Sequence, residues 1–328
     1  MQILGLSGGS PNGNSEILLK TALQAAQEIA PPDAQIHFVR VPDISIPRHF
    51  RVSDAKSAQG AIEQSADPSA TNEPDDRPFV LRAIMEADII ILSCPIYTRT
   101  IPGIVKHFQD MTMGPFQDTA MARHRQRMAA ATGDSSSDED FELLFKPRVA
   151  GLMAVGGAAG TDWTPFGLPL MHQMFFSMGI QVVSQFQVNG CGLPGSILLD
   201  AAALEKARQL GVLLVSQAGK QDVTFQGPQQ GTCPLCHLDM IVVKDGNEVE
   251  CATCGAQGRF VVEPGENLVT VEFNEEGRKS SVLTETGKDL HLQEIMRVAG
   301  SLRPRMAEVA DSREHFKKLD TEWLVKFS

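Results

Sequence analysis

The sequence has neither a long hydrophobic run nor an excess of positive charge. No apolar stretch approaches the roughly 18 residues that a membrane-spanning helix requires, and the first residues show no signal-peptide pattern. Acidic residues outnumber basic ones by 40 to 29, which gives a net charge of −11. This acidity argues against nucleic acid or an anionic membrane as the main partner. We therefore expect a soluble, cytoplasmic protein, whose 42% of hydrophobic residues can build a full core.

The glycine-rich segment GLSGGSPNGNSE at residues 5–16 lacks two common nucleotide-binding signatures. Its glycines do not follow the G-x-G-x-x-G spacing, and no lysine follows its last glycine. The segment does follow an apolar run and lead into an amphipathic helix, so its backbone amides can hold an anion at the helix N-terminus. Hydroxyl and amide side chains without a cation suit one phosphate monoester. The alternative is an ordinary strand-to-helix turn.

Apolar strands and amphipathic helices alternate along the first two thirds of the chain. Strands are predicted over 1–6, 35–41, 87–92, 149–155 and 181–187, and helices over 15–29, 78–86, 101–111, 165–177 and 199–216. On the first helix, Glu16, Lys20 and Gln27 are expected to face outward. This alternation predicts an α/β fold with a flavodoxin-like, doubly wound parallel five-stranded sheet, in a domain of residues 1–219.

Two segments interrupt this pattern, and the end of the chain has a different character. Residues 42–76 are predicted as a long loop, and the polar residues 113–147 as a lid, an insertion or a disordered loop. After Gly219, short strands and tight turns are predicted between residues 240 and 273, followed by a helix over 290–309. We expect residues 220–328 to form a small β-rich domain with a C-terminal helix.

Four of the six cysteines form two C-x-x-C pairs, CPLC and CATC. The linker between the pairs suits a two-stranded ribbon, which brings the thiolates together as tetrahedral coordination requires. We expect Cys233, Cys236, Cys251 and Cys254 to hold Zn²⁺ as a structural staple. Iron in a rubredoxin-like FeS₄ centre is the alternative, because an S₄ tetrahedron accepts both metals; two disulfides are less favoured in a cytosolic chain. His237 is redundant as a fifth donor and is expected at the surface.

Two further loops follow predicted strands and therefore reach the same edge of the sheet as the glycine-rich segment. They read CPIYTRTIPG at residues 94–103 and GGAAGTDWTPFG at residues 156–167. Tyr97 is the only tyrosine and suits stacking against a flat ring, while Gly156 and Gly157 permit close approach. The alternatives are that Tyr97 packs at the surface and that Trp163 packs in the core.

Together, these loops resemble the NADPH-dependent FMN reductase and iron–sulfur flavoprotein family, which has a flavodoxin-like fold. The family pattern is a G-S-P-R-x-x-G-N-T/S loop, then a strand ending in S-P-V/I-Y before a helix containing L-K-x-F-x-D. This chain has GGSPNGNSE and ADIIILSCPIYTRTIPGIVKHFQDM. It departs from the pattern at Asn12, where a basic residue is usual. It also has no cysteine in residues 42–80, so no iron–sulfur cluster is expected there.

The resemblance implies a set of site residues. The FMN phosphate would be held by Ser7, Ser10, Asn12, Asn14 and Ser15. The ring and ribityl chain would contact Pro95, Ile96, Tyr97, Thr98 and Arg99, with Gly156 and Gly157 at the far edge of the ring. Tyr97, Arg99 and Trp163 are the catalytic candidates, and Phe166 joins Arg99 and Trp163 on the substrate side.

The resemblance also implies an activity. The chain would be an NAD(P)H-dependent FMN oxidoreductase that reduces a small organic acceptor by ping-pong hydride transfer, as a homodimer or homotetramer. One alternative is an electron-transfer flavoprotein that passes single electrons between FMN and an FeS₄ centre. Another is a flavin reductase component that serves a protein redox partner. The acceptor, and the choice between NADH and NADPH, are left open by the sequence.

Overall fold

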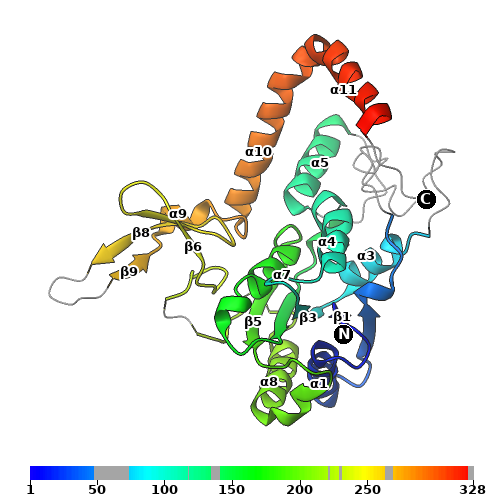
Figure 1. Ribbon diagram of the computed structural model, residues 1–328, viewed down its shortest axis with the longest axis vertical. Coiled ribbons are helices and arrows are strands. Elements are labelled where there is room, and N and C mark those ends of the chain that lie inside the picture. Colours follow the sequence, from blue (N-terminus) through cyan, green and yellow to red (C-terminus); the bar gives the residue numbers. More distant parts are fainter. Residues whose placement is uncertain are drawn as a thin grey trace.

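A five-stranded parallel sheet forms the centre of the larger domain (Figure 1). The computed structural model describes residues 1–47, 74–116, 118–133, 141–220, 222–228, 231–262 and 269–323. The strand order is β2-β1-β3-β4-β5, as in a doubly wound sheet. The strands are β1 (Gln2–Ser7), β2 (Gln35–Arg40), β3 (Ile89–Ile96), β4 (Val149–Gly156) and β5 (Gln181–Val188). The predicted fold class is confirmed.

Helices cover both faces of this sheet. On one face, α1 (Asn14–Ile29) and α8 (Ala201–Gln217) share a hydrophobic core with the strands. They approach so closely that a Cβ on Gly211 would collide with the Ala22 carbonyl oxygen. The other face carries α3 (Arg77–Glu86), α4 (Gly103–Phe116) and α7 (Gly167–Phe176). Both faces of β3 and β4 are therefore buried, which explains their nearly continuous apolar sequences.

The predicted lid or loop at residues 113–147 is largely helical, which corrects the sequence interpretation. Helix α4 extends to Phe116, and α5 (Thr119–Thr132) and α6 (Phe141–Phe145) follow. The Asp118 side chain caps α5 by accepting a hydrogen bond from the Met121 amide. Alanine, arginine and glutamine are good helix formers, so a polar composition does not prevent a helix here. The Ser/Asp-rich stretch at 134–140, like most of the predicted loop at 42–76, lies outside the described residues.

A second, antiparallel sheet with the order β6-β7-β8-β9 carries the cysteines. Its strands are β6 (Ile241–Val243), β7 (Glu248–Cys251), β8 (Gln257–Val262) and β9 (Val269–Glu272), and a short helix α9 (Glu275–Lys279) follows. The linker before it returns to the main sheet, because the Gln226 amide donates to the Val183 carbonyl at 2.8 Å. The small β-rich domain is therefore anchored on the edge strand β5.

The single predicted C-terminal helix is in fact two helices joined by a 3-10 segment. Helix α10 (Glu285–Leu302) begins earlier than expected, capped by Thr284, and α11 (Ala310–Trp323) follows Arg303–Val309. Pro304 lies at the start of the 3-10 segment, where its missing amide hydrogen interrupts the α-helical pattern. No helix among the residues described is long and apolar enough to cross a membrane.

Candidate functional site

The glycine-rich loop lies at the carboxyl edge of the parallel sheet and is held to β3. The Gly8 amide donates to the Ser93 carbonyl at 2.8 Å. A Cβ on Gly8 would press on Cys94 Sγ and Val105 Cγ2, so this position needs glycine. Burial raises the pKa of the Cys94 thiol to about 12, and Cys94 is therefore a neutral packing residue.

Two of the predicted phosphate ligands turn their hydroxyl groups toward the inside of this loop. The buried Ser7 Oγ accepts from the Gly9 amide at 3.4 Å. The buried Ser15 Oγ lies so close to Gly9 that a Cβ there would collide with it. Ser10 and Asn12 are exposed, and Asn12 has a φ of 55°, a left-handed conformation that asparagine tolerates. The loop thus presents hydroxyl and amide groups around a glycine backbone.

Glu16 braces the loop from below and is fully buried, contrary to the outward orientation predicted for it. Its carboxylate pairs with Arg40 Nε and Lys20 Nζ, each at 2.6 Å, and accepts from the Asn12 amide at 3.2 Å. Burial alone would raise the pKa of Glu16, but hydrogen bonds from Arg40 and Lys20 outweigh it and lower the pKa to about 2. The ion pair neutralises a carboxylate that would otherwise repel a phosphate beside it.

Asn14 reaches the same region from the first turn of α1, but its side chain is committed to another loop. Its Nδ2 donates to the carbonyl oxygens of Cys191 and Leu193 at 2.9 and 2.8 Å, and its Oδ1 accepts from the Ile197 amide at 3.1 Å. The backbone amide of Asn14 lies in the first turn of α1, where amides have no partner within the helix. The side chain therefore positions the loop between β5 and α8, a role that the sequence did not indicate.

The second loop is a tight turn after β3. Tyr97 and Thr100 exchange two backbone hydrogen bonds, and the residues between them, Thr98 and Arg99, have φ values of 48° and 72°. Two successive left-handed residues define a turn that usually contains glycine or asparagine. A β-branched residue such as Thr98 is strained in this conformation, and such strain often marks functional positions. The Tyr97 side chain is 55% exposed.

The third loop follows β4 and contacts the second. The Arg99 guanidinium lies over the Phe166 ring, 5.4 Å from its centroid. A Cβ on Gly156 would collide with Thr164, whose hydroxyl accepts from Gln187 Nε2 at 2.6 Å. Trp163 is 60% exposed, so core packing does not explain it. Two exposed aromatic side chains, Tyr97 and Trp163, thus lie on loops at the edge that carries the glycine-rich loop.

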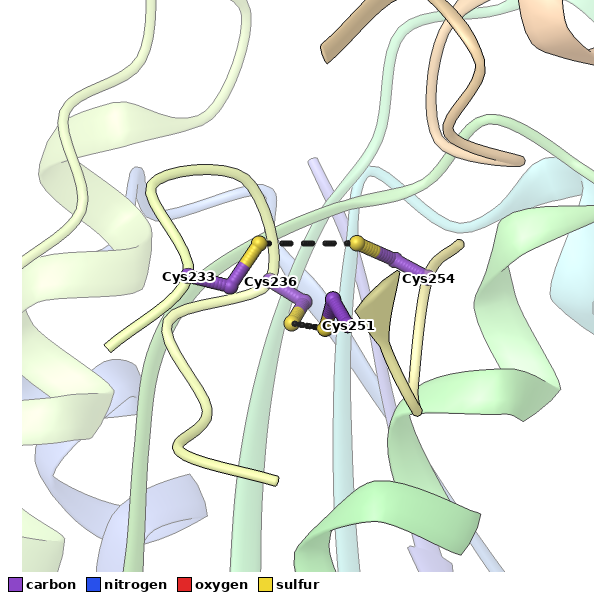
Figure 2. A group of neighbouring side chains, drawn as sticks. All are labelled: Cys233, Cys236, Cys251 and Cys254. Atoms are coloured by element: carbon purple, nitrogen blue, oxygen red, sulfur yellow. Dashed lines mark hydrogen bonds between the residues drawn. The ribbon is translucent and has the colours of Figure 1, made fainter. Parts of the chain in front are cut away.

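The four predicted metal ligands converge in the small domain. Their Sγ atoms all lie within 4.8 Å of one another, with Cys233 and Cys254 at 3.6 Å and Cys236 and Cys251 at 3.4 Å (Figure 2). Figure 2 shows one pair on each of two facing segments. All four side chains are buried, and this set of thiols fits a tetrahedral metal ion.

The two cysteine pairs have the same backbone geometry. The His237 and Gly255 amides donate to the carbonyls of Cys233 and Cys251, four residues earlier in each case. Both residues are left-handed, with φ values of 57° and 72°. His237 was predicted to be a surface residue without a role. Its ring in fact stacks on Phe225, with the two centroids 3.7 Å apart. This stacking helps hold a conformation that suits glycine better than histidine.

The fold and the edge loops define a flavodoxin-like oxidoreductase. The chain belongs to the family NADPH-dependent FMN reductase, whose sequence profile matches residues 1–190. A protein from Aspergillus candidus named flavone synthase cfoJ is 42% identical over 332 residues, covering 99% of this chain and 98% of the relative. A solved structure named flavone reductase superposes with a TM-score of 0.75 at 22% identity, over 100% of this chain and 99% of that one. The second similarity shows that the fold, including the small domain, is shared along the whole chain.

Proposed function

We propose that the chain is an FMN-dependent NAD(P)H oxidoreductase acting on a small, planar organic acceptor of the flavonoid class. The observation that carries this proposal is the placement of exposed Tyr97 and Trp163 on loops at the sheet edge that also bears the hydroxyl-lined Gly9 loop. Membership of the family supports FMN and NAD(P)H. The names of the two relatives, flavone synthase and flavone reductase, support a flavonoid acceptor.

The glycine-rich loop would hold the FMN phosphate without a cationic side chain. Ser7, Ser15 and the exposed Ser10 offer hydroxyl donors, and Asn14 offers its backbone amide at the start of α1. Asn12 offers its exposed side-chain amide, because its backbone amide already donates to Glu16. The buried Glu16 pair with Arg40 keeps the loop's shape and leaves the surroundings close to neutral. A phosphate monoester fits such a set of neutral donors.

The two other loops would position the ring and the substrates. Pro95, Ile96, Tyr97, Thr98 and Arg99 would line one side of the ring, and Gly156 and Gly157 the far edge. FMN, when bound, supplies a ring that takes hydride from NAD(P)H and gives it to a second substrate. The chain's part is to orient both substrates in turn on one face and to exclude water. Tyr97 would stack on a flat substrate, and Arg99, supported by Phe166, would meet an anionic or carbonyl group.

The first experiment is the absorption spectrum of the purified protein, followed by turnover. We expect a yellow protein with about one FMN per chain that oxidises NADPH or NADH in the presence of a flavone. The reverse reaction, oxidation of a flavanone, is assayed in the same preparation. A protein that neither retains FMN nor binds it on addition would overturn the proposal. FMN binding without any turnover of flavone or flavanone would overturn the acceptor class alone.

We further propose that the cysteine cluster holds zinc as a structural staple. The small sheet has few buried apolar side chains besides the four cysteines, so a metal would supply much of its stability. Iron would instead support single-electron transfer to or from FMN. Metal analysis separates these functions: colourless zinc supports the staple, and iron with a thiolate charge-transfer absorption supports electron transfer.

The cellular setting and assembly are also proposals. We propose a cytoplasmic homo-oligomer, a dimer or a tetramer, without nucleic acid or membrane as partner. The alternative, a flavin reductase component, is tested by reconstituting the pathway with and without the partner enzyme. In that case NAD(P)H oxidation by this chain would continue while the product of the partner disappeared.

A further inference from the structure

The C-terminal helices form an arm that extends away from both sheets (Figure 1). The base of α10 is fixed to α5: Arg123 pairs with Glu285, and the buried Lys288 Nζ donates to Thr119 Oγ1 at 3.4 Å. Beyond this base, Figure 1 shows α10 continuing past α5 and α11 turning back from its tip. The base is therefore integral to the fold, while the distal part of α10 projects beyond it.

One apolar stripe runs along α10 from the buried base to the exposed tip. Its members on α10 follow the three- and four-residue spacing of a helix–helix seam: Leu292, Ile295, Ala299 and Leu302. Leu292 is 6% exposed, but Ile295 and Leu302 are 49% and 50% exposed. The stripe thus begins in contact with the chain's own core and continues without cover in the part of the chain that the structure describes.

The bend after α10 adds more exposed apolar side chains. These are Met306 and Val309 in the bend and Phe316 on α11, with Met296 and Val298 beside the stripe on α10. Within the described residues, α10 and α11 each pack on the 3-10 segment between them but not extensively on each other. The arm is therefore an open V whose helices lack the partner that an apolar stripe normally has.

The exposed apolar side chains and the charge of the arm favour a second copy of this chain as that partner. The apolar side chains of the arm named above, Leu292 and Ala299 excepted, are each 40% to 67% exposed, and such a concentration is typical of an interface rather than of a free surface. Residues 285–323 carry eight acidic and seven basic side chains, although the whole chain has a net charge of −11. Two arms can therefore approach each other with little of the repulsion that the rest of the surface would cause.

We propose that the arm is a dimerisation element, in which the α10 stripe and the apolar side chains of its bend pair with the same surface of a second copy. In a twofold dimer, the same surface of each copy meets itself, and helices with this apolar spacing pack side by side as a bundle. The proposal concerns assembly and does not depend on the flavin chemistry. It assigns the interface of the homo-oligomer to residues outside the part of the chain that matches the FMN reductase family, which ends at residue 190.

The test is the solution mass of the full-length protein by light scattering at about 10 µM, where a stable interface is occupied. We expect at least twice the chain mass of 35.6 kDa. The double variant Ile295→Glu/Leu302→Glu should halve that mass, because two carboxylates in an apolar seam weaken association by about 100-fold or more. Leu290→Glu is the matched control: Leu290 is equally exposed on the same helix, at 52%, but lies off the stripe.

Circular dichroism and metal content show that each variant is folded. A second measurement is hydrogen exchange of the amides in residues 292–309, which should slow as protein concentration rises. Three results would overturn the proposal: a monomeric wild type, an unchanged mass in the folded double variant, or an equal loss of mass in Leu290→Glu.

Discussion

The side-chain amide of Gln185 donates a 2.7 Å hydrogen bond to the carbonyl oxygen of Cys236. Gln185 belongs to the edge strand of the parallel sheet, and Cys236 belongs to the first cysteine pair. Leu168, in the first turn of α7, also packs against the cysteine cluster. The small domain is thus attached to β5 and to α7, the helix that follows the third edge loop, so the cysteine cluster lies against the elements beside the candidate flavin site.

Removing this hydrogen bond should loosen the metal. In Gln185→Leu, the Cys236 carbonyl loses its buried hydrogen-bond donor, which should destabilise the proposed zinc-bound state by about 1.4 kcal/mol. If this cost falls on the bound state alone, zinc should transfer to a chromogenic chelator about tenfold faster. Gln181→Leu is the control, because Gln181 is an exposed glutamine of the same strand. Equal release rates in the two variants would show that the contact does not stabilise the metal centre.

Gly9→Ala should weaken FMN binding while leaving the fold intact. The added methyl group would collide with Ser15 Oγ and crowd Pro95, so it would displace one of the hydroxyls proposed to hold the phosphate. We expect FMN affinity, measured by fluorescence titration, to fall by at least about tenfold, or 1.4 kcal/mol. Gly103→Ala adds the same methyl group at the start of α4, where no atom lies within 4 Å, and should bind FMN normally. Unaltered binding in Gly9→Ala would exclude this loop as the phosphate site.

Glu16→Gln should destabilise the protein in a pH-dependent manner. Loss of the buried carboxylate removes the ionic partner shared by Arg40 and Lys20, while Arg40 keeps its second pair with Asp43. The free energy of unfolding should fall by about 2 kcal/mol at pH 7. The pKa of Glu16 is lowered from 4.5 to about 2, so its ionic contribution is complete above pH 4.5 and is lost as the pH falls toward 2. Urea unfolding of both proteins at several pH values measures the difference. A difference that stays constant from pH 7 to pH 3 would contradict the assignment.

The strained turn after β3 predicts different effects of glycine at two threonines. Thr98 has a left-handed backbone, so Thr98→Gly relieves strain of about 1–2 kcal/mol that roughly offsets the entropy cost of glycine. Thr100 has no positive φ, and Thr100→Gly should lower stability by about 1 kcal/mol. Thermal unfolding compares the two variants. If Thr98→Gly were the less stable one, the left-handed conformation would not be strained.

The centre of the sheet could be predicted because its strands β3 and β4 are buried on both faces. Ile89–Ile96 and Val149–Gly156 are apolar along nearly their whole length, and the turns between elements carry their usual residues. Burial of Glu16 could not be predicted, because it depends on Arg40, which β1–β2 pairing brings beside it. A glutamate in the first helical turn followed by a basic residue at the end of the next strand is the only sequence signal of this pair.

Other features depend on contacts between distant segments. Helix α5 looked like a polar loop because its partner, the base of α10, lies more than 150 residues later in the sequence. The cysteine cluster was predictable from spacing alone, since four thiols in two short pairs carry their geometry with them. The attachment of the cluster to β5 could not be predicted, because nothing in the sequence distinguishes Gln185 from the other polar residues of this edge strand.

The hydrogen bonds of Asn14 also bear on the order in which the protein matures during synthesis. Asn14 leaves the ribosome early, yet its partners Cys191, Leu193 and Ile197 are translated much later. A nascent chain that ends before these residues has the glycine-rich loop but not the loop that holds Asn14 in place. Cofactor capture would then wait for the loop that follows the last strand of the sheet, so a yellow colour would report that translation has passed this loop.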